Sequence, residues 1–146
     1  MKHLILTTCL LAAPAAWAET PPVTYIVEDS FENVAFAVES AIIGAGLVID
    51  HVSHTGEMLE RTRGDVGSDK VLFGQADVFS FCSATVSRQV MEADQLNIQH
   101  CPYGIFVFDS PDAPGKVTVG HRDYDGSMAP VNDLLSGIVK DALGLD

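Results

Sequence analysis

Two cysteines and a histidine are the residues of this chain best able to do chemistry. Cys82 ends a β-type run directly before a helical pattern, and a thiolate at a helix N-terminus is stabilised by the helix dipole and free amides. His100, beside Cys101, offers a neighbouring base, and Ser83 and Tyr103 complete the candidate binding set. Cys82 is the candidate catalytic thiol. The sequence nevertheless favours a structural reading, a disulfide or two inert thiols.

Metal or cofactor binding is the chemical alternative at the same residues. Cys82, Cys101 and His100 together could hold Cu, Zn or the edge of a haem, because thiolate and imidazole suit these groups. No cofactor is predicted, and these three groups are kept only as alternatives.

A bond between Cys82 and Cys101 depends on the compartment and on the path of the chain. The chain has three cysteines, but Cys9 lies in the apolar N-terminal run that we expect to be removed, which leaves two. An even number in an oxidising compartment favours one disulfide, and unpaired thiols there are vulnerable to oxidation. A regular strand–helix–strand crossover opposes the bond, because a parallel second strand starts at the opposite edge of the sheet. The Cα atoms of a disulfide lie within about 7 Å of each other. Only the connection from Asp94 to His100 could return Cys101 towards Cys82, so both outcomes stay open.

Two weaker patterns also invite a metal interpretation. His51 and His54 are three residues apart, which would bring them together on a helix but sends them to opposite faces of a strand. Residues 47–54 alternate as a strand, so we expect solvated histidines rather than ligands. Residues 123–126 resemble part of a calcium loop but lack the required glutamate, and we interpret them as a turn.

Known catalytic motifs are missing from the sequence. It contains no glycine-rich phosphate loop, no G-x-S-x-G elbow and no C-x-x-C pair. Ser136-Gly137 falls within the final amphipathic segment and is interpreted as structural. The sequence therefore favours a protein that is not a self-sufficient enzyme.

The first eighteen residues resemble a secretory signal peptide. A short polar start, Lys2-His3, precedes an apolar run over residues 4–16, and Ala16-Trp17-Ala18 supplies the small-x-small pattern of a cleavage site. The run is too short to span a bilayer as a mature helix. We expect cleavage before Glu19 and a soluble periplasmic protein.

Charge narrows the range of partners. The chain has 8 basic and 20 acidic residues, and removal of Lys2 with the leader changes its net charge from −12 to −13. Such a surface repels phosphate backbones and anionic lipid headgroups, so we expect neither nucleic-acid nor membrane binding after cleavage. Metal cations, basic proteins and neutral molecules remain possible partners.

Hydrophobic periodicity predicts one α+β domain over residues 19–146. Ser30 is a natural N-cap for a helix over residues 31–42, Ser83 can cap the next helix, and Pro130 suits the start of a last helix over 130–143. A short helix is expected within 56–69. Strands are expected at 23–27, 47–54, 77–82, 104–108 and 117–121. This order predicts a two-layer sandwich, with a mixed, mostly antiparallel sheet and helices on one face.

Several segments resemble the exported bacterial branch of domain-of-unknown-function family 302. They are Phe81-Cys82-Ser83-Ala84, Met91-Glu92-Ala93-Asp94, Asn97-Ile98, Cys101-Pro102-Tyr103 and Ile105-Phe106-Val107-Phe108. The segment that begins with the helix at Ser30-Phe31 resembles the N-terminal half of the family's domain. The part of the chain that resembles the family covers about residues 23–122. The resemblance implies a small α+β domain, often dimeric, without established catalytic activity.

The sequence thus favours an exported binding or accessory module. The alternative is a thiol- or metal-dependent redox protein that uses Cys82 with Cys101 and His100, linked to periplasmic sulfur metabolism. The partners we expect are a second copy of the chain or a basic periplasmic protein.

Overall fold

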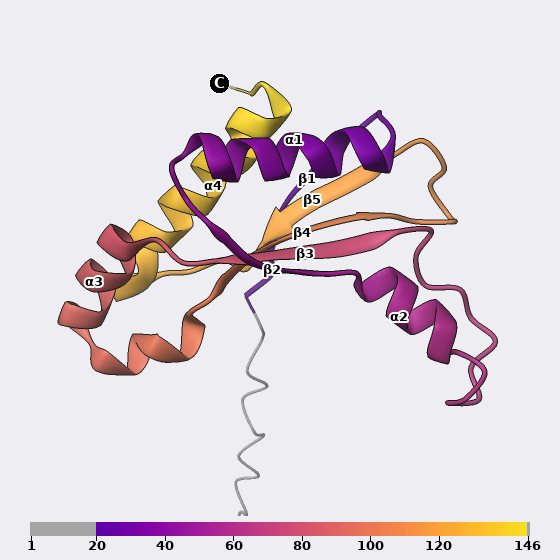
Figure 1. Cartoon of the computed structure of the whole chain (residues 1–146), viewed down its shortest axis with the longest axis horizontal. Coiled ribbons are helices and arrows are strands. Elements are labelled where there is room, and N and C mark those ends of the chain that lie inside the picture. Colours follow the sequence, from indigo (N-terminus) through magenta and orange to yellow (C-terminus); the bar gives the residue numbers. More distant parts are fainter. Residues whose placement is uncertain (1–19, 146) are drawn as a thin grey trace, which may run out of the picture.

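Five strands form one antiparallel sheet in the order β1-β5-β4-β3-β2. The structure is a computed structural model that describes residues 20–145 (Figure 1). The predicted signal peptide and Glu19 lie outside the described residues. The strands are β1 (Val23–Val27), β2 (Ile49–Ser53), β3 (Ala76–Phe81), β4 (Tyr103–Asp109) and β5 (Val117–His121).

A helix follows every strand along the chain except β4, which leads directly into β5. The helices are α1 (Phe31–Gly44), α2 (Thr55–Thr62), α3 (Ala84–Ala93) and α4 (Ala129–Leu143), with short 3₁₀ helices η1 (Gln95–His100) and η2 (Gly126–Met128). The predicted order of strands and helices is confirmed, including a short helix between β2 and β3. Among the described residues, no helix is both long and apolar enough to cross a bilayer.

Local sequence signals explain where the helices begin and end. The Ser30 hydroxyl accepts a hydrogen bond from the Asn33 amide at 3.2 Å and so caps α1. Pro130 stands in the first turn of α4, where a missing amide proton costs nothing. Gly144 ends that helix with a φ of 63°, a conformation that glycine adopts without strain.

The core lies between the sheet and the pair α1 and α4, which contact each other on the same side of the sheet (Figure 1). Alternate residues of each strand point into it, because side chains alternate between the two faces of a strand. The core includes Val38 and Ile42 of α1, Leu135 of α4, and Phe79, Phe81, Ile105, Val107 and Val119 of the sheet. The predicted two-layer α+β architecture is confirmed.

The strand directions complete the predicted architecture. Every neighbouring pair is antiparallel, where a mixed, mostly antiparallel sheet was expected. The parallel crossover considered as one path between residues 77–82 and 104–108 does not occur. After α3, the six residues of η1 fold the chain back, and β4 starts where β3 ended, with Tyr103 opposite Phe81. The predicted strand over 47–54 is shorter, and its pairing with β3 is irregular between Ile49 and His51.

Candidate functional site

Cys82 and Cys101 are joined by a disulfide. The S–S distance is 2.03 Å and the two Cα atoms are 6.3 Å apart. Cys82 directly follows β3 and Cys101 directly precedes Tyr103 in β4, so the antiparallel pairing brings both to the same end of the sheet. Both residues are half-buried. The disulfide that was expected for an oxidising compartment is confirmed. The argument against the bond assumed that β3 and β4 are parallel, whereas they are antiparallel.

The other predicted site residues around this disulfide have structural contacts. The Ser83 hydroxyl accepts from the Val86 amide at 3.3 Å and caps α3. The buried Tyr103 hydroxyl lies 3.0 Å from the Ser87 hydroxyl. The His100 ring packs edge-on against Tyr124, 5.5 Å between centroids.

Metal binding by the cysteines would require a different redox state. Two sulfurs bonded to each other offer no thiolate, and thiolate is the form of cysteine that binds metals. Across residues 20–145, no cluster of three or more His, Cys, Asp or Glu residues is arranged to hold a metal ion. Cu, Zn and haem at Cys82, Cys101 and His100 stay alternatives that concern only the reduced protein.

A cleft of about 620 Å³ lies at the other end of β3, where α2 meets the sheet. Gly56 makes this meeting possible, because a Cβ at that position would lie 2.6 Å from the Ala76 amide nitrogen. The polar residues of the cleft wall are His54, Glu57, Glu60, Arg61, Gln75 and Asp77. At its rim the Gln75 side chain donates to Glu32 at 2.7 Å, which lowers the pKa of that carboxyl group.

A histidine–aspartate pair stands in this cleft. His54 Nδ1 lies 2.8 Å from an Asp77 carboxylate oxygen, and the side chains are 63% and 15% exposed respectively. A carboxylate only accepts, so Nδ1 carries the proton and Nε2 of the neutral ring is left as an acceptor. An Asp that orients a His in this way is common in catalytic and ligand-binding sites.

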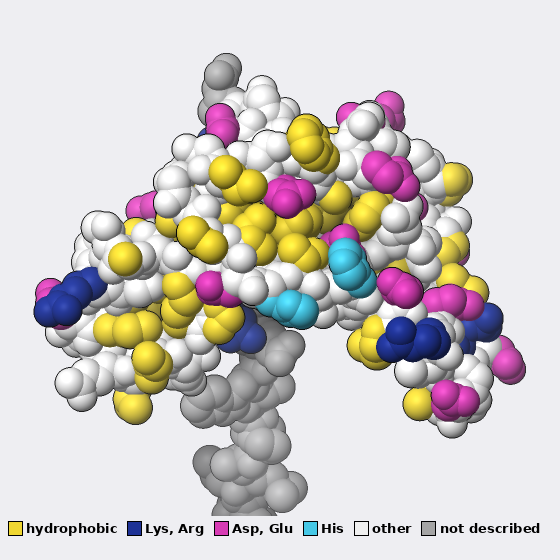
Figure 2. Space-filling view, in the orientation of Figure 1, with side chains coloured by type: hydrophobic (Ala, Val, Ile, Leu, Met, Phe, Trp, Pro, Cys, Tyr) yellow, Lys and Arg dark blue, Asp and Glu magenta, His cyan; other side chains and the backbone are white. Residues whose placement is uncertain are grey.

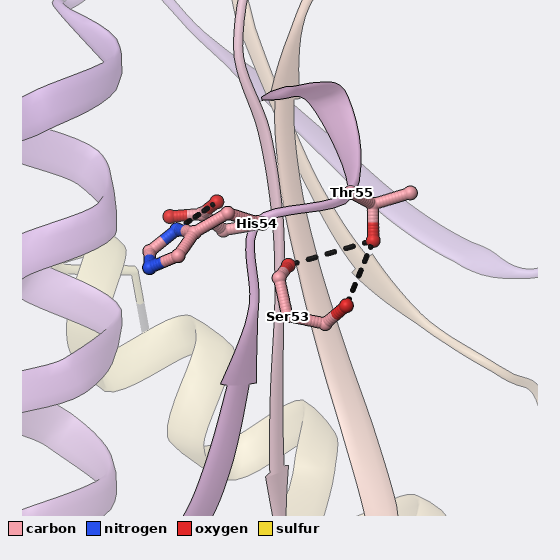
Figure 3. Close-up of polar contacts among 4 residues, drawn as sticks. Ser53, His54 and Thr55 are labelled. Atoms are coloured by element: carbon pink, nitrogen blue, oxygen red, sulfur yellow. Dashed lines mark hydrogen bonds and ion pairs between the residues drawn. The ribbon is translucent and has the colours of Figure 1, made fainter. Parts of the chain in front are cut away.

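Within residues 20–145, no serine or threonine hydroxyl is hydrogen-bonded to this pair. Figure 3 shows the His54 ring on one side of the chain and the hydroxyls of Ser53 and Thr55 on the other. These two hydroxyls lie 3.2 Å from each other, and Thr55 Oγ1 also donates to the Ser53 carbonyl at 3.4 Å. The arrangement fits ligand binding better than the chemistry of a serine hydrolase.

The two histidines of the 51–54 pattern are separated, as predicted. His51 is exposed on β2 opposite Ser80, whereas His54 has left the strand and occupies the N-cap position of α2. His54 is not simply solvated, since it is bonded to Asp77, 23 residues away. The predicted turn at 123–126 is also confirmed, with Asp125 preceding η2 and Gly126 at a φ of 56°.

His121 is a buried polar residue that the sequence reasoning missed. It is 0% exposed, and its Nδ1 and Nε2 lie 2.8 Å from the Arg122 carbonyl and 3.0 Å from the Ser136 hydroxyl. The ring therefore ties β5 to α4. The sequence did contain a signal for the burial of His121. His121 alternates with Val117 and Val119 along the strand and therefore lies on the same face as these two core residues. Without exposed surface, the Ser136–His121 pair is structural.

Stability should depend on pH through His121. Burial lowers the pKa of His121 below its ordinary value of 6.5. As the pH falls through 6.5, His121 becomes protonated in the unfolded chain but stays neutral in the folded chain. The free energy of unfolding should therefore fall, by at most about 1.4 kcal/mol per pH unit for this one group. Urea denaturation between pH 7.5 and 5.5 should show a smaller dependence for His121→Gln than for the unmodified chain. If the free energy of unfolding of His121→Gln depended on pH as steeply as that of the unmodified chain, this account would be wrong.

The comparisons with known proteins bear on the fold. No protein-family model matches this chain, and no curated protein matches it significantly. Among solved structures, the uncharacterized conserved protein DUF302 from Bacillus stearothermophilus superposes with a TM-score of 0.67 at 14% sequence identity. The match covers 83% of this chain and 97% of that chain. The chain has a DUF302-like fold. The resemblance in the sequence is thus confirmed for the fold, and at this identity the DUF302 neighbour carries no information on activity.

Proposed function

We propose that this protein is an exported binding module whose ligand occupies the cleft beside His54. The observation that carries the proposal is the His54–Asp77 pair, which presents an oriented ring nitrogen to a cleft of about 620 Å³ without a hydroxyl nucleophile beside it. Clefts of this size with a few oriented polar groups are typical of small-molecule sites. Export is supported by the signal-like first eighteen residues, and a disulfide is typical of proteins in oxidising compartments.

The charges of the cleft limit the class of ligand. Three carboxylates, Glu57, Glu60 and Asp77, face one guanidinium, Arg61, and the whole chain is strongly acidic. An anionic ligand would be repelled, so the cleft is suited to a neutral or cationic small molecule that donates a hydrogen bond to His54 Nε2.

Removal of the His54 ring is expected to weaken binding at the cleft about two- to tenfold, the effect of losing one hydrogen bond worth about 0.5–1.5 kcal/mol. The probe is a library of small neutral and cationic organic molecules, screened by NMR against chain secreted from a bacterium. Bound compounds should shift the amide signals of residues 54–61 and 75–77, and His54→Ala should remove the shifts. His51→Ala is the matched control, because His51 is also exposed but lies outside the cleft wall. Compounds that bind elsewhere, or no compound at all, would overturn the proposal.

Export is tested on the same preparation. The intact mass of the secreted protein should correspond to a chain that starts at Glu19 and carries one disulfide. A full-length chain recovered from the cytoplasm would contradict the export part of the proposal while leaving the cleft to be judged by the screen.

A redox role is the second candidate, favoured by the position of the disulfide. Cys82 directly precedes Ser83, the N-cap of α3, where a thiolate released on reduction would be stabilised. A partner dithiol would reduce the bond to two thiols and itself be oxidised to a disulfide. Equilibration with dithiothreitol measures the potential. A value near that of thioredoxin, about −270 mV, would support exchange, whereas a value below about −300 mV is typical of a structural bond.

A further inference from the structure

A second cavity, of about 410 Å³, lies between α2 and the loop that follows this helix. We call it the loop pocket, and its wall is formed by residues of the segments 56–63 and 66–73. It uses a different face of α2 from the cleft described above, since Met58 and Leu59 line the loop pocket but not the cleft. The helix therefore separates two sites with different surroundings.

Large apolar side chains form much of the loop pocket. Several of them, including Met58 and Leu72, remain exposed to solvent, so the core of the fold does not use them. Apolar side chains gathered around a cavity of several hundred Å³ are typical of small-molecule sites. A ligand of this pocket must therefore be largely apolar. The apolar part of the wall consists of Met58, Leu59, Val66, Leu72 and Phe73.

Arg63, the C-cap residue of α2, combines a structural role with an unused donor. Its Nη2 donates to the Glu60 carboxylate and its Nη1 to the Asp69 carbonyl, each at 3.0 Å. These two bonds hold the loop against the helix. The Nε of Arg63 is buried, and within residues 20–145 it has no hydrogen-bond partner. A buried donor without an acceptor destabilises the folded chain, so a ligand that supplies an acceptor there would gain affinity.

The charges around the loop pocket are the reverse of those in the cleft. Arg63 and Lys70 stand in its wall with one carboxylate, Glu60, which is already paired with Arg63. Two other acidic residues of the loop, Asp65 and Asp69, do not line the pocket. Figure 2 shows Lys and Arg side chains over α2, next to hydrophobic ones. The wall of the loop pocket therefore favours an anionic group, although the chain as a whole is acidic.

We propose that the loop pocket binds a medium-chain fatty acid. The carboxylate accepts a hydrogen bond from Arg63 Nε and is attracted by the Lys70 ammonium group, and the alkyl chain packs against the apolar wall. Arginine suits this ligand because hydrogen bonds between charged groups are roughly twice as strong as those between neutral ones. At about 30 Å³ per non-hydrogen atom, the share of a water molecule in the liquid, the pocket has room for about thirteen atoms. Decanoate is of this size.

Titration of decanoate into the chain beginning at Glu19, with its disulfide intact, tests the proposal by NMR. The alkyl chain should give intermolecular NOEs to the methyl groups of Met58, Leu59 and Leu72. The matched ligand is 1-decanol, which keeps the chain and replaces the carboxylate by a neutral hydroxyl. Decanoate should bind at least about tenfold tighter than 1-decanol, the effect of hydrogen bonds to a charged group.

Two substitutions test the cations. Arg63→Lys keeps the charge but removes Nε, and should weaken decanoate binding at least about tenfold. Lys70→Gln removes one exposed cation, and should weaken decanoate binding about two- to fivefold while leaving the affinity for 1-decanol unchanged. If Arg63→Lys also loosens the loop, its affinity for both ligands falls, and Lys70→Gln then decides. The matched control is Arg88→Gln, which removes the same charge from a side chain of α3 that is 79% exposed and should bind decanoate like the unmodified chain.

Four outcomes would overturn the proposal. They are no binding of decanoate, NOEs only to residues outside the loop pocket, equal affinity for decanoate and 1-decanol, and a preference for decanoate that Lys70→Gln leaves unchanged. Decanoate reports on the loop pocket, whereas the neutral and cationic compounds report on the cleft. This proposal and the proposed function can therefore fail separately.

Discussion

Replacing Cys82 and Cys101 together by serine is expected to lower the free energy of unfolding by about 3 kcal/mol. The disulfide joins residues 19 apart in sequence, and without it the unfolded chain regains the conformational freedom that this closed loop removes. It also holds the end of β3 to the start of β4, across the segment that contains α3 and η1. Urea denaturation monitored by circular dichroism, in the absence of reductant, measures the loss.

Reduction of the unmodified chain provides the control for this double variant. With dithiothreitol present, the unmodified chain should unfold at the same urea concentration as Cys82→Ser/Cys101→Ser, and the variant should not respond to the reductant. A stability difference below about 1 kcal/mol would mean that the loop gains little freedom when opened. Cleft binding should survive in the folded variant, because Asp77 and Cys82 lie at opposite ends of β3. Loss of cleft binding would show that the disulfide and the cleft are coupled.

Gly120→Ala is expected to destabilise the protein by about 2 kcal/mol or more, as overpacking of a sheet does. The new Cβ would lie 2.5 Å from the Val23 carbonyl oxygen and 2.6 Å from Phe106 Cζ. The ring can move aside, but the carbonyl belongs to the backbone of β1, the neighbour of β5 in the sheet. Either β1 shifts away from β5 or the β5 backbone distorts. Urea denaturation should show a lower midpoint with an unchanged slope.

Gly104→Ala is the matched control on the same face of the sheet. A Cβ at Gly104 would have Val78 Cγ1 as its nearest neighbour, at 3.5 Å, an ordinary van der Waals contact. We expect a change of at most about 0.5 kcal/mol, the usual range for substitutions that disturb no specific contact. Lower backbone freedom of the unfolded chain would by itself stabilise both alanine variants. If both variants lost the same stability, the close approach at Gly120 would not be the cause of the loss.

The elements of the fold could be predicted because their signals are local. The apolar spacing of α1, its cap at Ser30 and the proline at the start of α4 act within a few residues, so each helix is largely determined by its own segment. The same holds for the alternation in β3, which puts Phe79 and Phe81 on one face of the strand, and the structure buries that face in the core. The two-layer architecture follows, because each element has one apolar face to bury.

The tertiary structure decided which distant residues meet. The disulfide depends on the return of the chain through η1, which makes β4 antiparallel to β3 and brings Cys101 to Cys82. The pairing of His54 with Asp77 depends on the register of β2 against β3 and on the exit of the chain into α2. The alignment of Phe106 with Gly120 and of Phe108 with Thr118 depends on the pairing of β4 with β5, and α1 and α4 cover the other side of the sheet (Figure 1). Each of these contacts joins residues far apart in sequence, and their meeting depends on the packing of the whole chain, which local patterns do not encode.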